Sequence, residues 1–307
     1  MGAQVKALVT GHRGFVGRHM KAALEARGYE VVGRDIANGI DCREYFRISD
    51  HHYDLVVHCA AVVGGRTMID GAPLELAVED LTIDAEMFRW AMRTHPGRIV
   101  YFSSSAAYPI GLQSAGAHRP LNEDDIPTND IYFGVPDQTY GWVKLTGERL
   151  AVEANKAGIR THVFRPFSGY GSDQDESYPF PAIIRRALNH PPGAPFKVWG
   201  SPVSTRDWVH IDDVVACVLA AIDADDIGPM NICSGRATSF RELAELAMQA
   251  AGTWGEVVGD ESQPMGVMHR VGNPWRMTHC VGNYAKLTSI IEGVARGVNE
   301  MIARGFA

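Results

Sequence analysis

A glycine-spaced turn close to the N-terminus, Gly11-His-Arg-Gly14-Phe-Val-Gly17, restricts the fold of this chain more than any other feature. It follows an apolar run at residues 5–10 that is typical of a buried strand, and it opens a helical segment at residues 14–27. Glycines at this spacing allow the backbone to approach a pyrophosphate, while the helix N-terminus offers amide donors and positive potential. The alternative is that the glycines are needed only for the tight turn between strand and helix and bind no ligand. In its context between strand and helix we predict a dinucleotide site formed by Gly11, Arg13, Gly14, Phe15, Val16 and Gly17.

Short apolar segments alternate with helical segments through the first half of the chain. We expect strands at residues 5–10, 30–33, 54–58, 98–103 and 161–165, and helices at residues 14–27, 76–92 and 140–157. The strands read as almost continuous apolar runs, which is typical of strands buried on both faces. The alternation therefore predicts an α/β fold, a Rossmann-type doubly wound parallel sheet.

A smaller C-terminal α/β lobe is expected beyond residue 166, because residues 166–202 are rich in Pro, Gly and Ser and break the alternation. Further helices are expected at residues 181–188, 208–222, 240–251 and 287–302. We assign residues 1–166 and about 206–230 to a dinucleotide-binding domain, and residues 167–205 and 231–307 to a substrate-binding lobe.

Composition limits the class of partner. A net charge of −7 and a pI near 5.9 do not indicate the clustered positive charge that binding to nucleic acid or to an anionic membrane normally needs, so we expect neither as a partner. No apolar run is long enough to span a bilayer and the start lacks a signal peptide, so we expect a cytoplasmic protein. The cysteines, at positions 42, 59, 217, 233 and 280, are spaced as free thiols. The histidines form no metal-binding pattern, and we predict no metal.

The choice of dinucleotide depends on the end of the second expected strand. Asp35 lies there, eighteen residues after Gly17, where a carboxylate accepts hydrogen bonds from adenosine ribose hydroxyls, and this favours NAD. Arg13 and Arg34 keep NADP as the alternative, because guanidinium groups suit a ribose phosphate. Asp41 and Cys42 are predicted to contact the adenine edge, with a helix-capping role as the alternative for the aspartate.

A Tyr and a Lys four residues apart, Tyr140-Gly-Trp-Val-Lys144, lie on one face of an expected helix. A free tyrosine has a pKa of about 10 and is a poor base at neutral pH, but a fixed positive charge nearby lowers it. The pair alone is common by chance. Its position after the glycine turn and after the serine cluster at residues 103–105 predicts a hydride-transfer site.

Further motifs stand in order along nearly the whole chain. They are Leu55-Val-Val-His-Cys-Ala-Ala61, Phe102-Ser-Ser-Ser-Ala-Ala-Tyr-Pro109, Phe164-Arg-Pro-Phe167, Arg206-Asp-Trp-Val-His-Ile-Asp-Asp213 and Asn231-Ile-Cys-Ser-Gly235. With the glycine turn and the Tyr140 segment, they resemble the extended short-chain dehydrogenase/reductase family, in particular its nucleotide-sugar epimerases, dehydratases and reductases.

The resemblance implies roles by position. Tyr140 would be the acid/base, Lys144 would lower its pKa and bind the nicotinamide ribose, and Ser104 would hydrogen-bond the reacting sugar hydroxyl, with Ser105 as a second contact. For Ser103 we expect a strand-end hydroxyl that satisfies the backbone. The cofactor-binding set would also include Ala60, Ala61 and Pro166, and the substrate-binding set Ser168, Arg206 and Arg270. Ser168 departs from the Asn usual in the family, and the two arginines would hold the diphosphate.

The resemblance also narrows the reaction. A 4,6-dehydratase of this family carries an Asp-Glu pair where this chain has Ser105 and Ala106, so dehydration is not expected. Members that also epimerise other ring carbons use a Cys and a His, where Ala106 and Tyr178 stand. We therefore expect an NAD-dependent nucleotide-sugar 4-epimerase, with an NAD(P)H-dependent 4-keto-sugar reductase as the alternative and a non-catalytic dinucleotide-binding regulator as the alternative of another class. The partners implied are a nucleotide-diphosphate sugar and a second copy of the chain in a homodimer.

Overall fold

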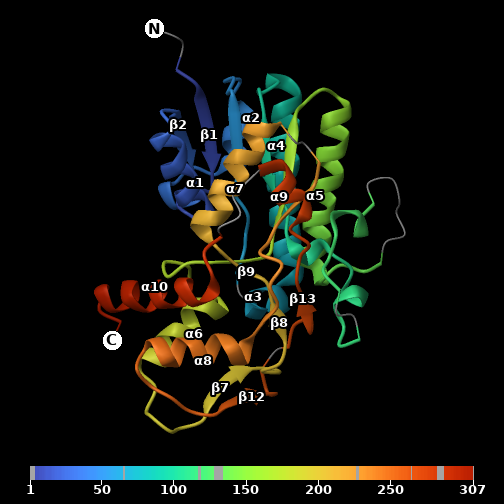
Figure 1. The fold of residues 1–307 in the computed structure, drawn as a ribbon. Coiled ribbons are helices and arrows are strands. Elements are labelled where there is room, and N and C mark those ends of the chain that lie inside the picture. The colour runs from blue at the N-terminus through green and yellow to red at the C-terminus, as the bar shows by residue number, and fades with distance from the viewer. Residues whose placement is uncertain are drawn as a thin grey trace.

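The computed structural model describes residues 4–64, 66–116, 119–127, 134–225, 228–263, 265–281 and 287–306. The ribbon shows a larger lobe built on a central sheet and a smaller lobe at one end of it (Figure 1). None of the helices within these ranges is both long enough and apolar enough to cross a bilayer. All five cysteines are free thiols.

Six parallel strands form the central sheet. They are β1 (Lys6–Thr10), β2 (Glu30–Arg34), β3 (Leu55–His58), β4 (Ile99–Phe102), β5 (Thr161–Pro166) and β10 (Met230–Ile232). Their order is β10-β5-β4-β3-β1-β2, and each neighbouring pair is parallel. This is the doubly wound α/β sheet predicted from the sequence, and that prediction is confirmed.

Helices cover both faces of the sheet, and each face has its own apolar core. On one face lie α1 (Phe15–Ala26), α7 (Ile211–Ala224) and α9 (Trp275–Val281). On the other lie α2 (Cys42–Ile48), α4 (Pro73–Thr94) and α5 (Gln138–Lys156). Successive residues of a strand point to opposite faces, so Ala7 and Val9 enter the first core while Leu8 enters the second.

The strand order places a crevice at the carboxyl ends of β1 and β3. From β1 the chain moves outward to β2, then crosses back so that β3 pairs with the other side of β1. Loops that follow the two strands diverge there, which is the usual ligand site of an open α/β sheet. At this point a Cβ on Gly11 would lie 2.8 Å from the amide nitrogen of Ala60.

The smaller lobe has a separate core. Its helices are α6 (Pro179–Leu188), α8 (Phe240–Ala250) and α10 (Ile290–Ala303), beside the parallel pair β7 (Phe196–Trp199) and β12 (Val257–Asp260). Large side chains such as Tyr170, Phe180 and Trp208 fill it. Figure 1 shows α6, α8, β7 and β12 at the end of the molecule opposite the N-terminus.

Short elements lie between and around the lobes. The strands are β6 (Ser168–Tyr170), β8 (Thr205–Arg206), β9 (Trp208–His210), β11 (Thr238–Ser239) and β13 (His269–Arg270), and the helical turns are η1 (Ile36–Asn38), η2 (Ser105–Ala107), η3 (Ile110–Gln113), η4 (Glu123–Asp125) and α3 (Arg66–Gly71). Strands β11, β8 and β13 form a three-stranded sheet, while β6 pairs with β9.

Three segments differ from expectation. The helix expected at residues 208–222 begins only at Ile211, because Trp208–His210 is a buried strand and the side chain of His210 caps the helix by accepting from the amide of Asp212. Strand β10 joins the central sheet and α9 packs beside α7 on its face, although both were assigned mainly to the smaller lobe. The division into a dinucleotide-binding domain and a substrate-binding lobe remains a prediction.

Candidate active site

The glycine turn packs tightly against its own backbone and against the end of β3, which is possible only because it lacks side chains. Gly11 has a left-handed φ of 63°, and a Cβ there would collide with the backbone of Cys59 and Ala60. A Cβ on Gly17 would lie 2.0 Å from the carbonyl oxygen of Gly11. Gly14 occupies the N-cap of α1 with no side chain to accept from the first-turn amides. The first-turn amides of α1 therefore have no side-chain cap, and amides in this position bind the phosphates of a dinucleotide well.

Asp35 lies beside this turn with a fixed carboxylate. One oxygen accepts from the amide of Arg13 at 2.8 Å and the other from the amide of Ala37 at 2.9 Å. The side chain of Arg13 donates to Asn38 Oδ1 at 2.6 Å, and the guanidinium of Arg34 stacks 4.4 Å from the centre of the Tyr45 ring. The geometry thus fixes a carboxylate just after β2, and its contact with ribose hydroxyls remains a prediction.

Asp41 and Cys42 follow at the start of α2. Asp41 caps this helix by accepting from the amide of Arg43 and also pairs with the guanidinium of that residue, which holds the pKa of the carboxyl below its usual value. Burial raises the pKa of the Cys42 thiol to about 12. The structure shows the helix-capping role for Asp41, and the adenine contact of either residue remains a prediction.

The structure brings the serine segment and the Tyr140 helix together. Helix α5 packs against η2, and the approach is so close that a Cβ on Gly141 would lie 2.3 Å from the carbonyl oxygen of Ala106. Ser104 precedes η2, and its hydroxyl accepts from the amide of Ala106 at 3.1 Å. Lys144 follows Tyr140 by one helical turn, with its Nζ 5.8 Å from the centre of the tyrosine ring. The structure therefore brings these two segments into contact, and the roles of the residues remain predictions.

Lys144 is buried, yet it faces negative charge. Burial alone lowers the pKa of its ammonium, but Tyr140, Asp84 and Asp80 act against burial and the net pKa is raised. Its Nζ also lies 5.6 Å from the centre of the Tyr101 ring. Lys144 therefore stays protonated at neutral pH, and its positive charge lies beside the ring of Tyr140.

The two aspartates that compensate Lys144 lie one turn apart on α4, and the sequence analysis missed both. Asp84 accepts from Tyr101 Oη at 2.6 Å and lies 3.3 Å from His58 Nε2. Burial alone would raise the pKa of the Asp84 carboxyl, but His58, the charge of Lys144 and the hydrogen bond from Tyr101 together hold it below its usual value. Asp80 accepts from the amide of Val62 and its other oxygen is buried without a partner in the described part of the chain. Burial raises the pKa of Asp80 to about 6. The sequence did carry a signal for this pair, because Asp80 and Asp84 are four residues apart on an otherwise apolar helix face.

A buried ion pair anchors α5 to the sheet one turn beyond Lys144. Glu148, one turn beyond Lys144, accepts from Arg165 of β5 at 2.9 and 2.7 Å. Ser103 also donates to Glu148, so its hydroxyl satisfies a carboxylate and not the backbone, contrary to expectation. Arg165 further donates to Tyr108 Oη at 3.0 Å. This network fixes the rotation of α5 relative to β4 and β5.

The predicted substrate arginines are register partners in the three-stranded sheet. Arg206 of β8 lies opposite Arg270 of β13. Arg206 donates to the carbonyl of Val267 at 2.8 Å and its guanidinium lies 5.4 Å from the centre of the Phe240 ring. Arg270 pairs with Asp137, at 2.6 Å. Contact of either guanidinium with a diphosphate remains a prediction.

The remaining predicted contacts lie where the lobes meet. Pro166 ends β5 at the carboxyl edge of the sheet, and Ser168 lies two residues further in β6. Ala60 and Ala61 follow β3 at the same edge. Tyr178 is the N-cap of α6. Its pKa is raised by burial and by the nearby Tyr140.

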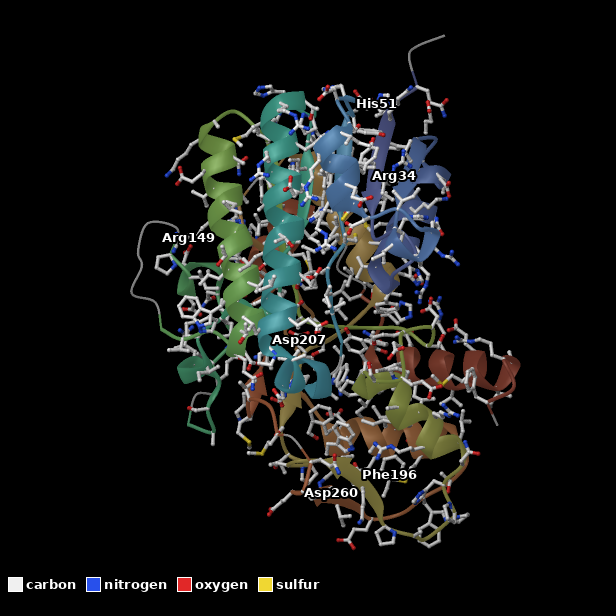
Figure 2. All side chains as sticks on the ribbon, turned by 180° about the vertical axis from the view of Figure 1, so that it is seen from behind. Arg34, His51, Arg149, Phe196, Asp207 and Asp260 are labelled. Atoms are coloured by element: carbon white, nitrogen blue, oxygen red, sulfur yellow. The ribbon has the colours of Figure 1, made fainter. Side chains whose placement is uncertain are left out.

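Asp207 orders the junction of the lobes, and the sequence analysis assigned it no role. Figure 2 shows it between the two lobes. Its carboxylate accepts from the amides of Ser234, Gly235 and Gly272 and from the Ser234 hydroxyl. Asp207 therefore ties β8 to the loop after β10 and to the chain after β13. Within the described ranges, no group of three or more His, Cys, Asp or Glu side chains is arranged to hold a metal ion.

Comparisons with known proteins place the chain in a family of enzymes. The model of the NAD dependent epimerase/dehydratase family matches residues 7–233. The chain is 27% identical over 310 residues to the GDP-L-fucose synthase of Escherichia coli strain K12, covering 92% of each. It is 26% identical over 302 residues to the dTDP-4-dehydro-6-deoxy-D-allose reductase of Streptomyces bikiniensis, covering 89% of this chain and 90% of the relative.

Among solved structures, the fold is similar to the UDP-glucose 4-epimerase of Thermotoga maritima with UDP-glucose. The TM-score is 0.83 at 22% identity, covering 98% of this chain and 99% of the other. The family description names NAD, and the glycine turn and Asp35 fit it, so the predicted cofactor is confirmed. The relatives are enzymes, which confirms an enzyme over a non-catalytic regulator, with nucleotide-sugar epimerase or reductase as the class of activity. Over most of its length, the chain belongs to the NAD-dependent epimerase/dehydratase family.

Proposed function

We propose that this protein is an NAD-dependent nucleotide-sugar epimerase that acts at C4 through a transient 4-keto sugar. The observation that carries the proposal is Asp35, whose two oxygens are held by the amides of Arg13 and Ala37. A carboxylate in this place accepts from the ribose hydroxyls of NAD and repels the additional phosphate of NADP. A retained NAD suits a reaction with no net change of redox state.

The residues of the site supply the proton chemistry of such a reaction. The glycine turn and Asp35 would hold NAD, which when bound would supply reversible hydride transfer at C4. Tyr140 takes the proton of the C4 hydroxyl as the C–H bond breaks, and it returns that proton when the ketone is reduced. Lys144 holds its positive charge beside the phenol, and Ser104 orients the hydroxyl by hydrogen bonding. The alcohol is oxidised and then re-formed, so protons and electrons balance over the cycle.

The site lacks the groups that other reactions of the family need. Elimination of water needs a carboxyl acid next to the active-site hydroxyl residue, and Ser105 and Ala106 occupy those positions. Epimerisation of ring carbons beside the ketone needs a base that removes a carbon-bound proton. Ala106 has no such group, and the raised pKa of Tyr178 keeps that phenol protonated. Chemistry confined to C4 is what remains.

A 4-keto-sugar reductase is the second candidate. The similarity to a dTDP-4-dehydro-6-deoxy-D-allose reductase and to GDP-L-fucose synthases favours it. The same Ser104, Tyr140 and Lys144 would then protonate the oxygen of a ketone while a hydride is delivered once. A homodimer that includes α5 in its interface and a cytoplasmic location are further predictions from the family and the sequence.

Identification of the dinucleotide and of the sugar change tests the proposal. Freshly purified protein is denatured, and any released dinucleotide is identified by mass and absorbance. UDP-, GDP- and dTDP-hexoses are then screened by NMR for inversion at C4, with Tyr140→Phe as the control. Stoichiometric NAD with inversion supports the epimerase. Tighter binding of NADPH than NADH, with net consumption during turnover, would establish the reductase instead, and absence of dinucleotide binding would refute both.

A further inference from the structure

One buried ion pair binds both ends of the segment that carries Ser104. Ser103, directly before it, donates its hydroxyl to Glu148 of α5. Tyr108, at the other end, accepts on its phenol oxygen from Arg165 Nη1 at 3.0 Å. Glu148 and Arg165 are joined to each other by hydrogen bonds of 2.9 and 2.7 Å. Ser104 therefore lies in a short segment that is held at both ends by the same two charged side chains.

Burial makes these contacts strong. The side chains of Arg165 and Tyr108 are fully buried, and those of Ser103 and Glu148 are 4% exposed. Burial alone lowers the pKa of Arg165, but the charge of Glu148 and the hydrogen bonds raise it, so the guanidinium keeps its charge. Buried charges are little screened by salt, and their hydrogen bonds are about twice as strong as those between neutral groups.

Glu148 belongs to the same helix face as Tyr140 and Lys144. The three residues follow one another at intervals of four, at positions 140, 144 and 148 of α5. The backbone hydrogen bonds of the helix keep this spacing rigid. A carboxylate that holds Ser103 therefore also fixes where the serine segment lies relative to the phenol of Tyr140.

The hydroxyl of Tyr108 is held from a second side. It donates to Asn231 Oδ1 at 2.7 Å, and Asn231 is a fully buried residue of β10. Burial raises the pKa of the Tyr108 phenol, so this hydrogen bond persists at neutral pH. With Arg165 as donor and Asn231 as acceptor, the direction of the hydroxyl is determined.

Backbone contacts join the middle of the segment to the start of α5. The amide of Asp137 donates to the carbonyl of Ala106 at 2.9 Å, and a Cβ on Gly141 would lie 2.3 Å from that oxygen. The middle of the segment thus packs directly on the helix. Its two ends depend on the side chains of Ser103 and Tyr108.

We propose that Ser103 and Tyr108 are positioning residues, which bind the two sides of the Glu148–Arg165 pair and so hold Ser104 at a fixed position relative to Tyr140. The inference rests on the proposed function in giving Ser104 and Tyr140 a shared substrate. It gives the buried ion pair a part in the chemistry as well as in stability.

Hydrogen exchange tests this arrangement without any substrate. Ser103→Ala and Tyr108→Phe each remove one hydroxyl and leave the ion pair in place. The matched control is Tyr53→Phe, which removes a buried phenol hydroxyl that lies 2.6 Å from that of Tyr45. We expect amide exchange at residues 106–108 to be about tenfold or more faster in the two variants and unchanged in the control. Wild-type exchange at these amides in both variants would overturn the proposal.

Kinetics separate positioning from a general loss of stability. With a nucleotide sugar that is turned over, we expect Ser103→Ala and Tyr108→Phe to lower kcat about tenfold while KM stays within about twofold, since positioning acts in the transition state. Ser103→Thr keeps the hydroxyl and should retain kcat within about twofold of wild type. The Kd for NAD should also stay within about twofold in every variant. A fall in kcat no larger than that of Tyr53→Phe would refute the positioning role.

Failure of the proposed function has a different signature. If no nucleotide sugar is turned over by wild type, the proposed chemistry fails, while hydrogen exchange still decides whether Ser103 and Tyr108 hold the segment. Faster exchange together with a wild-type kcat would show that the segment is held for stability alone, and it would overturn the proposal while the proposed function stands.

Discussion

Replacing Glu148 by Gln tests whether the buried ion pair between α5 and β5 stabilises the fold. Arg165 is fully buried and Glu148 is 4% exposed, with two N–O contacts of 2.9 and 2.7 Å between them. Glutamine keeps the shape and one acceptor but removes the charge, which leaves the guanidinium of Arg165 buried without a counterion. Removal of one partner from a buried pair costs about 3–5 kcal/mol. Because one acceptor remains, we expect a loss of about 3 kcal/mol in the free energy of unfolding.

Urea unfolding at constant NAD concentration measures this loss from the midpoint and slope. The matched control is Glu153→Gln on the same helix, where the partner Lys156 and the glutamate are 63% and 69% exposed. An exposed pair of this kind contributes about 0–1 kcal/mol. The second comparison is Glu148→Gln combined with Arg165→Met, which removes both charges and should cost less than the sum of the single changes.

Two results would refute this reasoning. A loss below about 1 kcal/mol for Glu148→Gln, equal to the control, would mean that water or local rearrangement compensates Arg165. Strict additivity in the double variant would mean that the two side chains do not stabilise each other.

Three further predictions follow from the site. Burial raises the pKa of Asp80 to about 6, so the folded state binds a proton there more tightly than the unfolded chain, and wild type loses stability as pH rises from about 4 to 6. Asp80→Asn should remove this pH-dependent loss of stability, which is on the order of 3 kcal/mol above pH 6. The measurement is the urea midpoint of each protein as a function of pH, and parallel curves for wild type and variant would contradict the prediction. Asp35→Asn should raise the Kd for NAD about tenfold or more in a fluorescence titration, and it should reduce the preference for NAD over NADP. Equal Kd values for NAD in variant and wild type would show that Asp35 does not bind the ribose. Tyr140→Phe should lower kcat about 10²- to 10⁴-fold with an unchanged Kd for NAD, and retained turnover would assign the proton transfer to another group.

Regular elements and the cofactor turn could be predicted from the sequence because their signals are local. The five strands expected in the first half of the chain appear as β1 to β5 with ends within one or two residues, and α5 begins at Gln138 where residue 140 was expected. The error at residues 208–222 has a physical cause. A buried apolar strand that runs directly into an apolar helix gives no change of hydropathy, and the cap at His210 is not among the preferred capping residues.

The sequence by itself determined the alternation of strands and helices, the glycine turn and the Tyr140–Lys144 pair, because each is encoded within a window of a few to about twenty residues. Tertiary structure alone decided which charges meet. Arg270 finds Gln113 at a separation of 157 residues, and Asp80 and Asp84 face Lys144 from a different helix. Such pairs depend on which loops share the carboxyl edge of the sheet and on how closely α4 and α5 pack. Hydrogen bonds and buried charges act over a few ångströms, so their partners exist only once the sheet order has brought distant segments together.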